Sequence, residues 1–165
     1  MAGNATLAQG DVLDDCPVLI PVAEMESDTP EARVEYRDVV VMSQSCDLEQ
    51  DKVDLVLVCP LQPLTDAASQ ERSPFRGKGR EKLRRGEYPG YHLLNRATTD
   101  GIRRDYTIVD FHNVYGMPLP FLREFAGKQD KRLRLLPPYR EHLSQAFARF
   151  FMRVGLPAEI TFDSP

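Results

Sequence analysis

The chain has 165 residues, of which 42% are hydrophobic and 28% are charged, and its formal net charge is −4. This length and composition are those of a globular protein with one domain and one core, and no apolar run is long enough to span a bilayer. The first residues, MAGNATLAQGDVL, lack the basic and apolar regions of a secretory signal. We therefore expect a cytoplasmic protein that has no membrane partner.

The charges are divided unevenly along the chain. Residues 1–75 carry 4 basic and 15 acidic side chains, whereas residues 76–165 carry 17 basic and 10 acidic ones. Such a division allows an acidic protein to present an electropositive face to an anionic partner. It is equally compatible with pairing between the two halves of the chain.

The three cysteines, Cys16, Cys46 and Cys59, are odd in number and do not have the spacing of metal ligands. This argues against a disulfide framework and against a zinc site built from cysteine, and we expect neither a metal nor a cofactor. Cys59 lies in the apolar run VLVCPL and is expected in the core. Cys46 has polar neighbours, so its role stays open.

Short runs of apolar, β-branched and aromatic residues between turn-forming residues predict a chain rich in β-strands. The predicted strands cover residues 10–13, 16–25, 33–45, 51–61, 91–95 and 104–117. Pro17 and Pro21 place the second of them at a sheet edge or a bulge. The third and fourth are separated by the short turn CDLEQD, so we expect them to be antiparallel neighbours.

Helical segments are predicted in the second half of the chain. Residues 62–80 are loop-like, and GREKLRRGE (79–87) is expected to form one or two helical turns. A C-terminal helix is predicted over about 138–154, between a Pro-Pro pair and Gly155. Apolar residues recur at helical spacing on one face of it, at Tyr139, Leu143, Ala146, Phe147, Phe150, Phe151 and Val154. These elements predict a small, mostly antiparallel β-barrel or sheet closed by a C-terminal helix.

The order of these elements, together with several short stretches, resembles the MazF/PemK-like toxin family. The stretches are Gly10-Asp11-Val12, Arg37-Asp38 followed by VVVMSQS, VDLVLVCPL, and YTIVDFHNV followed by Arg132-Leu133-Arg134-Leu135 before the last helix. The match is one of pattern and not of identities.

The resemblance implies a single domain over 1–165, mostly β with α. The implied fold is a small SH3-like antiparallel β-barrel with a C-terminal amphipathic helix and a basic loop or helix inserted at about 63–104. Members of the family are toxins of toxin–antitoxin systems, and many are sequence-specific endoribonucleases. The resemblance therefore implies an RNA-acting protein that forms a homodimer and is held by an antitoxin-like protein partner.

The chain departs from the family at the active site. The family has an arginine where a loop enters a strand, and a Thr or Ser after the second long strand. Arg37 matches the arginine, but Asp38 replaces a proline, and the hydroxyl position reads Cys59-Pro60-Leu61-Gln62. The insertion is also longer than usual. A catalytically lapsed relative is therefore an alternative to an active endoribonuclease.

RNA cleavage without a metal needs a base, an acid and a cation that stabilises the phosphorane. Arg37 is a candidate phosphate clamp, because a guanidinium forks onto two phosphate oxygens; the alternative is a surface ion pair with Asp or Glu. His92 or His112 can supply the acid or base at neutral pH, although a histidine on a strand is more often structural. The candidate catalytic set is Arg37, Ser43, Cys46, Asp47 and His92.

The run RGKGREKLRRGE (76–87) is a candidate nucleic-acid contact. If it lined a groove it would neutralise several phosphates, and Tyr88 and Tyr91 shortly after it could stack on unpaired bases. The alternative is a solvated loop. The candidate RNA-binding residues are Arg76, Lys78, Arg80, Lys82, Arg84, Arg85, Tyr88 and Tyr91.

Two further hypotheses need no ribonuclease. Cys46 could be the nucleophile of a Cys/His-dependent hydrolase if His92 or His112 stabilised its thiolate, but Asp47 opposes that charge, and no signature of a cysteine hydrolase surrounds it. Alternatively, the protein is a non-enzymatic SH3-like binding module for a protein or nucleic acid. The polar cluster at 43–50 would then be a recognition rim.

Overall fold

The computed structural model describes residues 6–22, 31–70, 73–99 and 101–152. Its strands are β1 (Val12–Pro21), β2 (Ala32–Val41), β3 (Leu55–Pro63), β4 (Tyr91–Leu94), β5 (Ala97–Thr99), β6 (Ile102–Arg104), β7 (Thr107–Asp110) and β8 (Tyr115–Pro118). Its helices are α1 (Ser45–Glu49), α2 (Leu64–Ser69), α3 (Lys78–Arg84), α4 (Leu119–Lys128) and α5 (Tyr139–Phe151).

Strand β3 organises the larger sheet, because it pairs with three other strands. Every pair is antiparallel, and the strand order is β1-β2-β3-β7-β4, with β8 beside the first half of β3. β5 and β6 form a separate hairpin. In the part of the chain that the structure describes, β1 and β4 each have one strand neighbour, so the sheet is open and not closed into a barrel. The mostly β prediction is confirmed, and the SH3-like barrel stays a prediction.

Strand β1 is one bulged strand where the sequence predicts two strands. The β1–β2 register shifts between Leu13 and Cys16, and Asp15 has a φ of +50°. Asp38 on β2 holds this bulge, because its carboxylate accepts hydrogen bonds from the backbone N–H of Asp15 at 3.1 Å and from Arg104 at 3.0 Å. β1 is an edge strand, as its two prolines predict.

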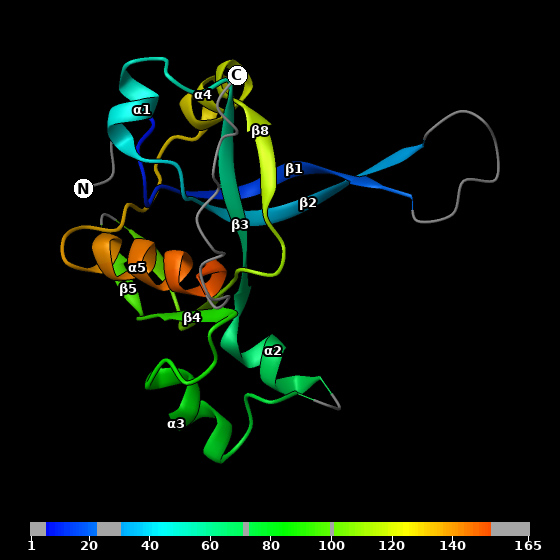
Figure 1. Cartoon of the computed structure of the whole chain (residues 1–165), viewed down its shortest axis with the longest axis vertical. Helices are drawn as coiled ribbons and strands as arrows, with labels where there is room; N and C mark the ends of the chain where they lie inside the picture. The colour runs from blue at the N-terminus through cyan, green and yellow to red at the C-terminus, as the bar shows by residue number, and fades with distance from the viewer. Residues whose placement is uncertain (1–5, 23–30, 71–72, 100, 153–165) are drawn as a thin grey trace, which may run out of the picture.

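The apolar run VVVM at the end of β2 is buried on both faces of the sheet. Val39 and Val41 lie in the cluster that α4 covers, whereas Val40 and Met42 lie in the cluster that α5 covers. Because side chains alternate along a strand, a strand covered on both faces is apolar at every position. Figure 1 shows α1 and α4 at one end of β3, and α2 and α3 at the other.

Helix α5 confirms the predicted C-terminal helix. Leu143 is buried against the sheet, and Ala146, Phe147 and Phe150 pack partly against the same cluster. These positions recur every three or four residues, so they form the apolar stripe of an amphipathic helix.

The two ends of the predicted apolar face are not in the core. Tyr139 and Phe151 are each 58% exposed, because they stand in the first and last turns of α5, beyond the centre of the sheet. Phe151 contacts the rings of Phe147 and Phe150 at centroid distances of 5.0 and 4.9 Å. Val154 lies outside the described residues.

A buried ion cluster joins the start of β1 to the segment before α5. Asp11 is fully buried, and its carboxylate accepts hydrogen bonds from Arg132 Nε at 3.0 Å and from Arg134. The backbone N–H of Val12 donates to the carbonyl of Leu133 at 2.9 Å. The two stretches that carry the family resemblance at the ends of the chain therefore contact each other.

Several elements differ from the prediction. The strand predicted over 104–117 is two strands, β7 and β8, because Asp110 ends β7 by accepting hydrogen bonds from the His112 N–H at 2.9 Å and from the Asn113 side chain at 2.7 Å. Part of the loop predicted over 62–80 is α2, and α4 was not predicted. Leu119 and Leu122 of α4 are buried. The turn after β2 is the short helix α1.

Candidate nucleic-acid interface

Three cavities of about 450, 590 and 400 Å³ meet around the edge strand β4. The first lies between α5 and the segment from α3 to β4, the second lies beside α3, and the third lies beside the start of α5. Leu93 on β4 lines all three. We call these three adjoining hollows, which share lining residues, the β4 groove.

Local packing fixes the walls of this groove. The buried ring of Phe75 contacts Tyr88 and Tyr91 edge-on at centroid distances of 5.8 and 5.0 Å, and Leu83 of α3 joins the same cluster. Gly90 lets the chain enter β4, because a Cβ there would stand 2.0 Å from His112 Cε1. The groove is therefore a product of packing between α3, β4 and β7.

The lining of the β4 groove is strongly basic. Among the described residues, it contains six arginines and one acidic side chain, Glu81. Arg84 and Arg85 bind Glu81 at 2.5 and 2.9 Å, and the hydrogen bond from Arg84 is the main cause that lowers the pKa of Glu81 to about 2. Glu81 therefore stays ionised and pairs with Arg84 and Arg85, and Arg134 pairs with buried Asp11. The net positive charge of the lining therefore comes mainly from Arg80, Arg96 and Arg149. The lining arginines are Arg80, Arg84, Arg85, Arg96, Arg134 and Arg149.

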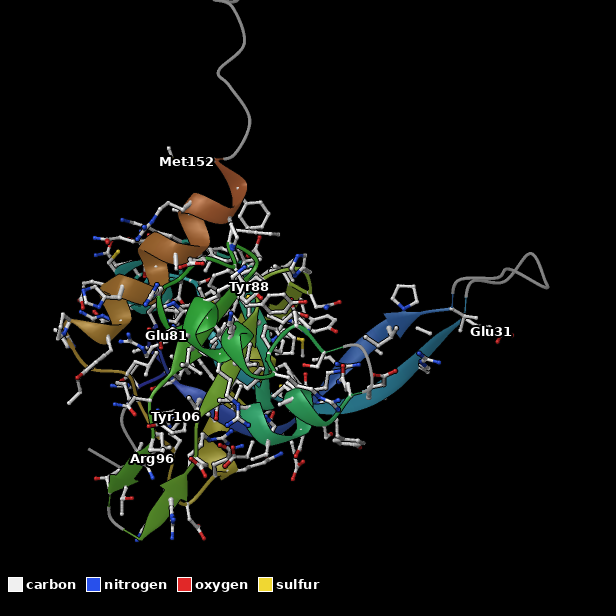
Figure 2. All side chains as sticks on the ribbon, turned by 90° about the horizontal axis from the view of Figure 1, so that it is seen from below. Glu31, Glu81, Tyr88, Arg96, Tyr106 and Met152 are labelled. Carbon is white, nitrogen blue, oxygen red and sulfur yellow. The ribbon has the colours of Figure 1, made fainter. Side chains whose placement is uncertain are left out.

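Four tyrosines line the groove together with these arginines. Tyr106 and Tyr139 are 36% and 58% exposed, and Tyr88 and Tyr91 line the first cavity. The guanidinium carbon of Arg96 lies 4.9 Å from the centroid of the Tyr106 ring, and Figure 2 shows the two residues side by side. Cations and flat aromatic surfaces in one groove suit a strand of phosphates and unpaired bases.

Two histidines meet where the first and third cavities join. His92 on β4 and His142 on α5 line both cavities. The pKa of His92 is lowered to about 4, mainly by burial and also by the positive charges of His142 and Arg149. The imidazole of His92 is therefore neutral at pH 7. Sequence reasoning predicts a site role for His92 and none for His142.

Part of the predicted basic run lines the groove, and part of it does not. Arg80, Arg84 and Arg85 line the groove, together with the predicted Tyr88 and Tyr91, whereas Arg76, Lys78 and Lys82 do not line it. Arg76 instead donates hydrogen bonds at 2.5 Å to the carbonyls of Ala68 and Ser69. That arginine holds the end of α2.

The structure does not bring the predicted catalytic set together. Arg37 forms an ion pair with Glu35 at 2.5 Å on the β1–β2 hairpin, which is the alternative that the sequence leaves open. Ser43 and Asp47 line a fourth cavity of about 530 Å³ against α5. His92 lines the β4 groove on another side of that helix.

Cys46 is exposed, and it has oxygen atoms around its sulfur. Its Sγ lies 3.7 Å from Gln44 Oε1 and 3.7 Å from Asp47 Oδ1. These neighbours are oxygen atoms, and not the cation that accompanies a cysteine nucleophile. Cys59 is buried as predicted, and burial raises its pKa to about 12.

Several groove residues were missed by sequence reasoning. His142, Gln145 and Arg149 line the first cavity from one face of α5, and their helical spacing is visible in the sequence. Arg96 and Tyr106 come from either side of the β5–β6 hairpin, and no sequence signal joins them. What the sequence does not show is that α5 lies beside β4.

Comparison of the chain with protein-family models finds no match, and comparison with curated proteins finds none either. Within residues 6–22, 31–70, 73–99 and 101–152, no helix is both long and apolar enough to cross a membrane. Over the same residues, no group of three or more His, Cys, Asp or Glu side chains is placed to hold a metal ion.

Proposed function

We propose that the protein binds single-stranded RNA in the β4 groove. The observation that carries this proposal is the composition of the lining. Among the described residues, the lining includes six arginines and four tyrosines, and its one acidic residue is a glutamate. Guanidinium groups bind phosphate oxygens in a bidentate way, and tyrosine rings stack on bases that are not paired. A duplex hides its base faces, so this lining favours a single strand.

The choice of RNA draws on the resemblance to the MazF/PemK-like family, which we retain as a proposal. Support for it comes from Gly10-Asp11-Val12 and Arg132-Leu133-Arg134-Leu135, which pack together around buried Asp11. The open edge at β4 is the feature that departs from a closed SH3-like barrel. In this proposal, that open edge is where the RNA lies.

Binding to a fluorescein-labelled single-stranded RNA pool, measured by anisotropy in EDTA, tests the proposal. The variant Arg96→Gln/Arg149→Gln removes two exposed cations from the groove, and we expect its dissociation constant to rise about tenfold or more. The matched control is Lys128→Gln, which removes an exposed charge of α4 and should leave the affinity unchanged. Equal weakening in the control, or none in the groove variant, would refute the proposal.

A second candidate function, protein binding, is favoured by the β1–β2 hairpin. Its outer half projects from the rest of the described chain (Figure 1), and Leu19 and Tyr36 are 66% and 70% exposed. An exposed apolar face of this kind marks a docking surface. The face consists of the cross-strand pairs Pro17–Tyr36, Leu19–Val34 and Pro21–Ala32.

The occupant that this face fits is a second copy of the chain. A flat apolar face is complementary to itself, so a twofold axis buries the same residues of both copies. Pro17 and Pro21 lack the N–H groups for pairing along the β1 edge, which leaves face-to-face packing. Light scattering should give a dimer mass for the parent and a monomer mass for Leu19→Lys/Tyr36→Lys. Leu55→Lys, at another exposed apolar position, is the control and should stay dimeric; a monomeric parent at high concentration contradicts this candidate.

A further inference from the structure

We propose that His92 and His142 are the base and the acid of a ribonuclease centre in the β4 groove. This inference rests on the proposed RNA binding and goes beyond it, because it assigns a reaction to the place where two of the cavities join. It also differs from the expectation for a MazF/PemK-like enzyme, in which the arginine at the position of Arg37 is central.

The geometry places both histidines against one space. His92 lies opposite Val109 in the β4–β7 register, so it faces the side of the sheet that α5 covers, and its ring stacks on Phe111 at 6.4 Å. His142 is exposed on α5 and lines the same two cavities. One ring is held by the sheet and the other by the helix, and both line the first and third cavities of the groove.

Their surroundings give the two rings different roles. His92 is neutral at pH 7, because burial and the charges of His142 and Arg149 lower its pKa to about 4, so it has a lone pair that can accept a proton. A phosphodiester between these cations would offset their repulsion and raise the pKa of His92 toward the working pH, where a general base is most effective. His142 is exposed on α5, where its ring can approach the leaving oxygen of a phosphodiester bound in the groove.

Arg149 supplies the cation that such a centre needs. It stands on α5, seven residues after His142, so the two lie on one face of the helix, and both line the first cavity. Its Nε donates to the Gln145 carbonyl at 3.3 Å, which leaves the other guanidinium N–H groups to bind phosphate. Arginine in this position stabilises the extra negative charge of a phosphorane.

The reaction balances without a metal or a co-reactant. His92 removes the proton of a ribose 2′-hydroxyl, and the 2′-oxygen forms a bond to the adjacent phosphorus. The bond between that phosphorus and the 5′-oxygen breaks, and His142 gives its proton to the leaving oxygen. The products are a 2′,3′-cyclic phosphate and a 5′-hydroxyl, and water exchange returns each histidine to its starting state.

The test uses the full chain in EDTA with two labelled oligonucleotides of one sequence, one RNA and one with 2′-deoxyribose throughout. We expect both to bind, and only the RNA to be cut, leaving 2′,3′-cyclic phosphate ends that mass spectrometry identifies. His92→Gln and His142→Asn should each lower the cleavage rate about 100-fold while anisotropy shows that RNA still binds. His112→Gln, a histidine outside the three cavities, is the matched control and should cut at the parental rate.

The outcomes separate this inference from the proposed function. RNA that is bound but not cut by the parent overturns the ribonuclease centre and leaves the binding function standing. Cleavage that persists in both His92→Gln and His142→Asn overturns the assignment of the two histidines. If RNA is not bound at all, the proposed function fails, and this inference fails with it. Because His142 is exposed, its variant keeps the fold, which circular dichroism can verify.

Discussion

Asp11 and Arg132 form a buried ion pair across 121 residues of sequence, with Arg132 Nε 3.0 Å from Asp11 Oδ2. The two residues are 0% and 5% exposed. The pair fixes the segment that leads into α5 against the start of β1, and α5 forms one wall of the β4 groove. The groove therefore depends on a contact between the two ends of the described chain.

Neutralising Asp11 should destabilise the fold strongly. In Asp11→Asn the guanidinium of Arg132 stays buried beside a neutral group, and the loss of its charged partner is expected to cost about 3 kcal/mol of unfolding free energy or more. Urea unfolding followed by circular dichroism measures this. Asp14→Asn is the control: Asp14 binds Arg104 with its side chain 55% exposed, so we expect a loss of about 1 kcal/mol or less. Equal losses in the two variants would contradict the structural role of the buried pair.

Replacing Tyr106 should separate base stacking from charge. Tyr106→Ala removes the ring that Arg96 covers, and we expect RNA affinity to fall about tenfold or more, since one stacked base contributes about 1 to 3 kcal/mol. Tyr106→Phe keeps the ring and should bind RNA like the parent. Tyr36→Ala removes an exposed tyrosine of the β1–β2 hairpin and should have no effect on RNA. Loss of affinity in the Phe variant would show that the hydroxyl acts, and not the ring.

The stability of the fold should fall with acid partly because of His92. Its folded-state pKa is about 4, below the usual value of about 6.5 for an unfolded chain. The unfolded state therefore binds more protons than the folded state between these pH values, so stability is lost as pH falls through 6.5 toward 4.

His92→Gln removes this contribution. Between pH 7 and pH 5, we expect the parent to lose about 1 to 2 kcal/mol more unfolding free energy than the variant. The other charged or titratable residues that line the same cavities as His92 are identical in the two proteins. They are His142 and Arg149 on α5, Arg84, Arg85, Tyr88 and Tyr91 in the first cavity, and Arg96, Arg134 and Tyr139 in the third. Parallel pH curves for the two proteins would show that His92 titrates normally.

The three cysteines should differ in their reaction with a thiol reagent such as DTNB. Cys46 is exposed and should react in the native protein, whereas Cys16 and Cys59 are buried, and burial raises their pKa values to about 11 and about 12. We expect one thiol to react natively at pH 8 and three after unfolding. Cys46→Ser should bind and cut RNA like the parent; loss of cleavage would favour the cysteine-hydrolase hypothesis instead.

Much of the fold follows from local sequence patterns. The prolines of β1 predict an edge strand, the apolar run VVVM predicts part of a strand over 33–45, and the apolar stripe of 138–154 predicts α5. The errors arise where individual side-chain contacts, and not the periodicity of the sequence, decide where an element forms or ends. Asp110 ends β7 by side-chain hydrogen bonds, which no periodicity shows. Helix α4 has 10 residues, and the buried side chains of Leu119 and Leu122 pack it into the core.

The site was predictable in part. The basic run and Tyr88 and Tyr91 follow one another in the chain, so composition is enough to nominate them. His142 and Arg149 join the site because α5 packs over Phe111 and lies beside β4, a non-local arrangement that sequence periodicity does not contain. The predicted catalytic cluster fails for the same reason, because the segment from Arg37 on β2 to Cys46 on α1 spreads its residues over different surfaces.

The salt dependence of RNA affinity tests the central claim most directly. If the arginines of the β4 groove bind phosphates, the logarithm of the association constant falls linearly with the logarithm of salt concentration, with a slope of about −0.7 for each phosphate bound. We predict a slope of about −2 or steeper for the parent, and a slope smaller in magnitude by about 1.4 for Arg96→Gln/Arg149→Gln. A flat salt response, or one slope shared by the parent and this variant, would contradict RNA binding in the groove.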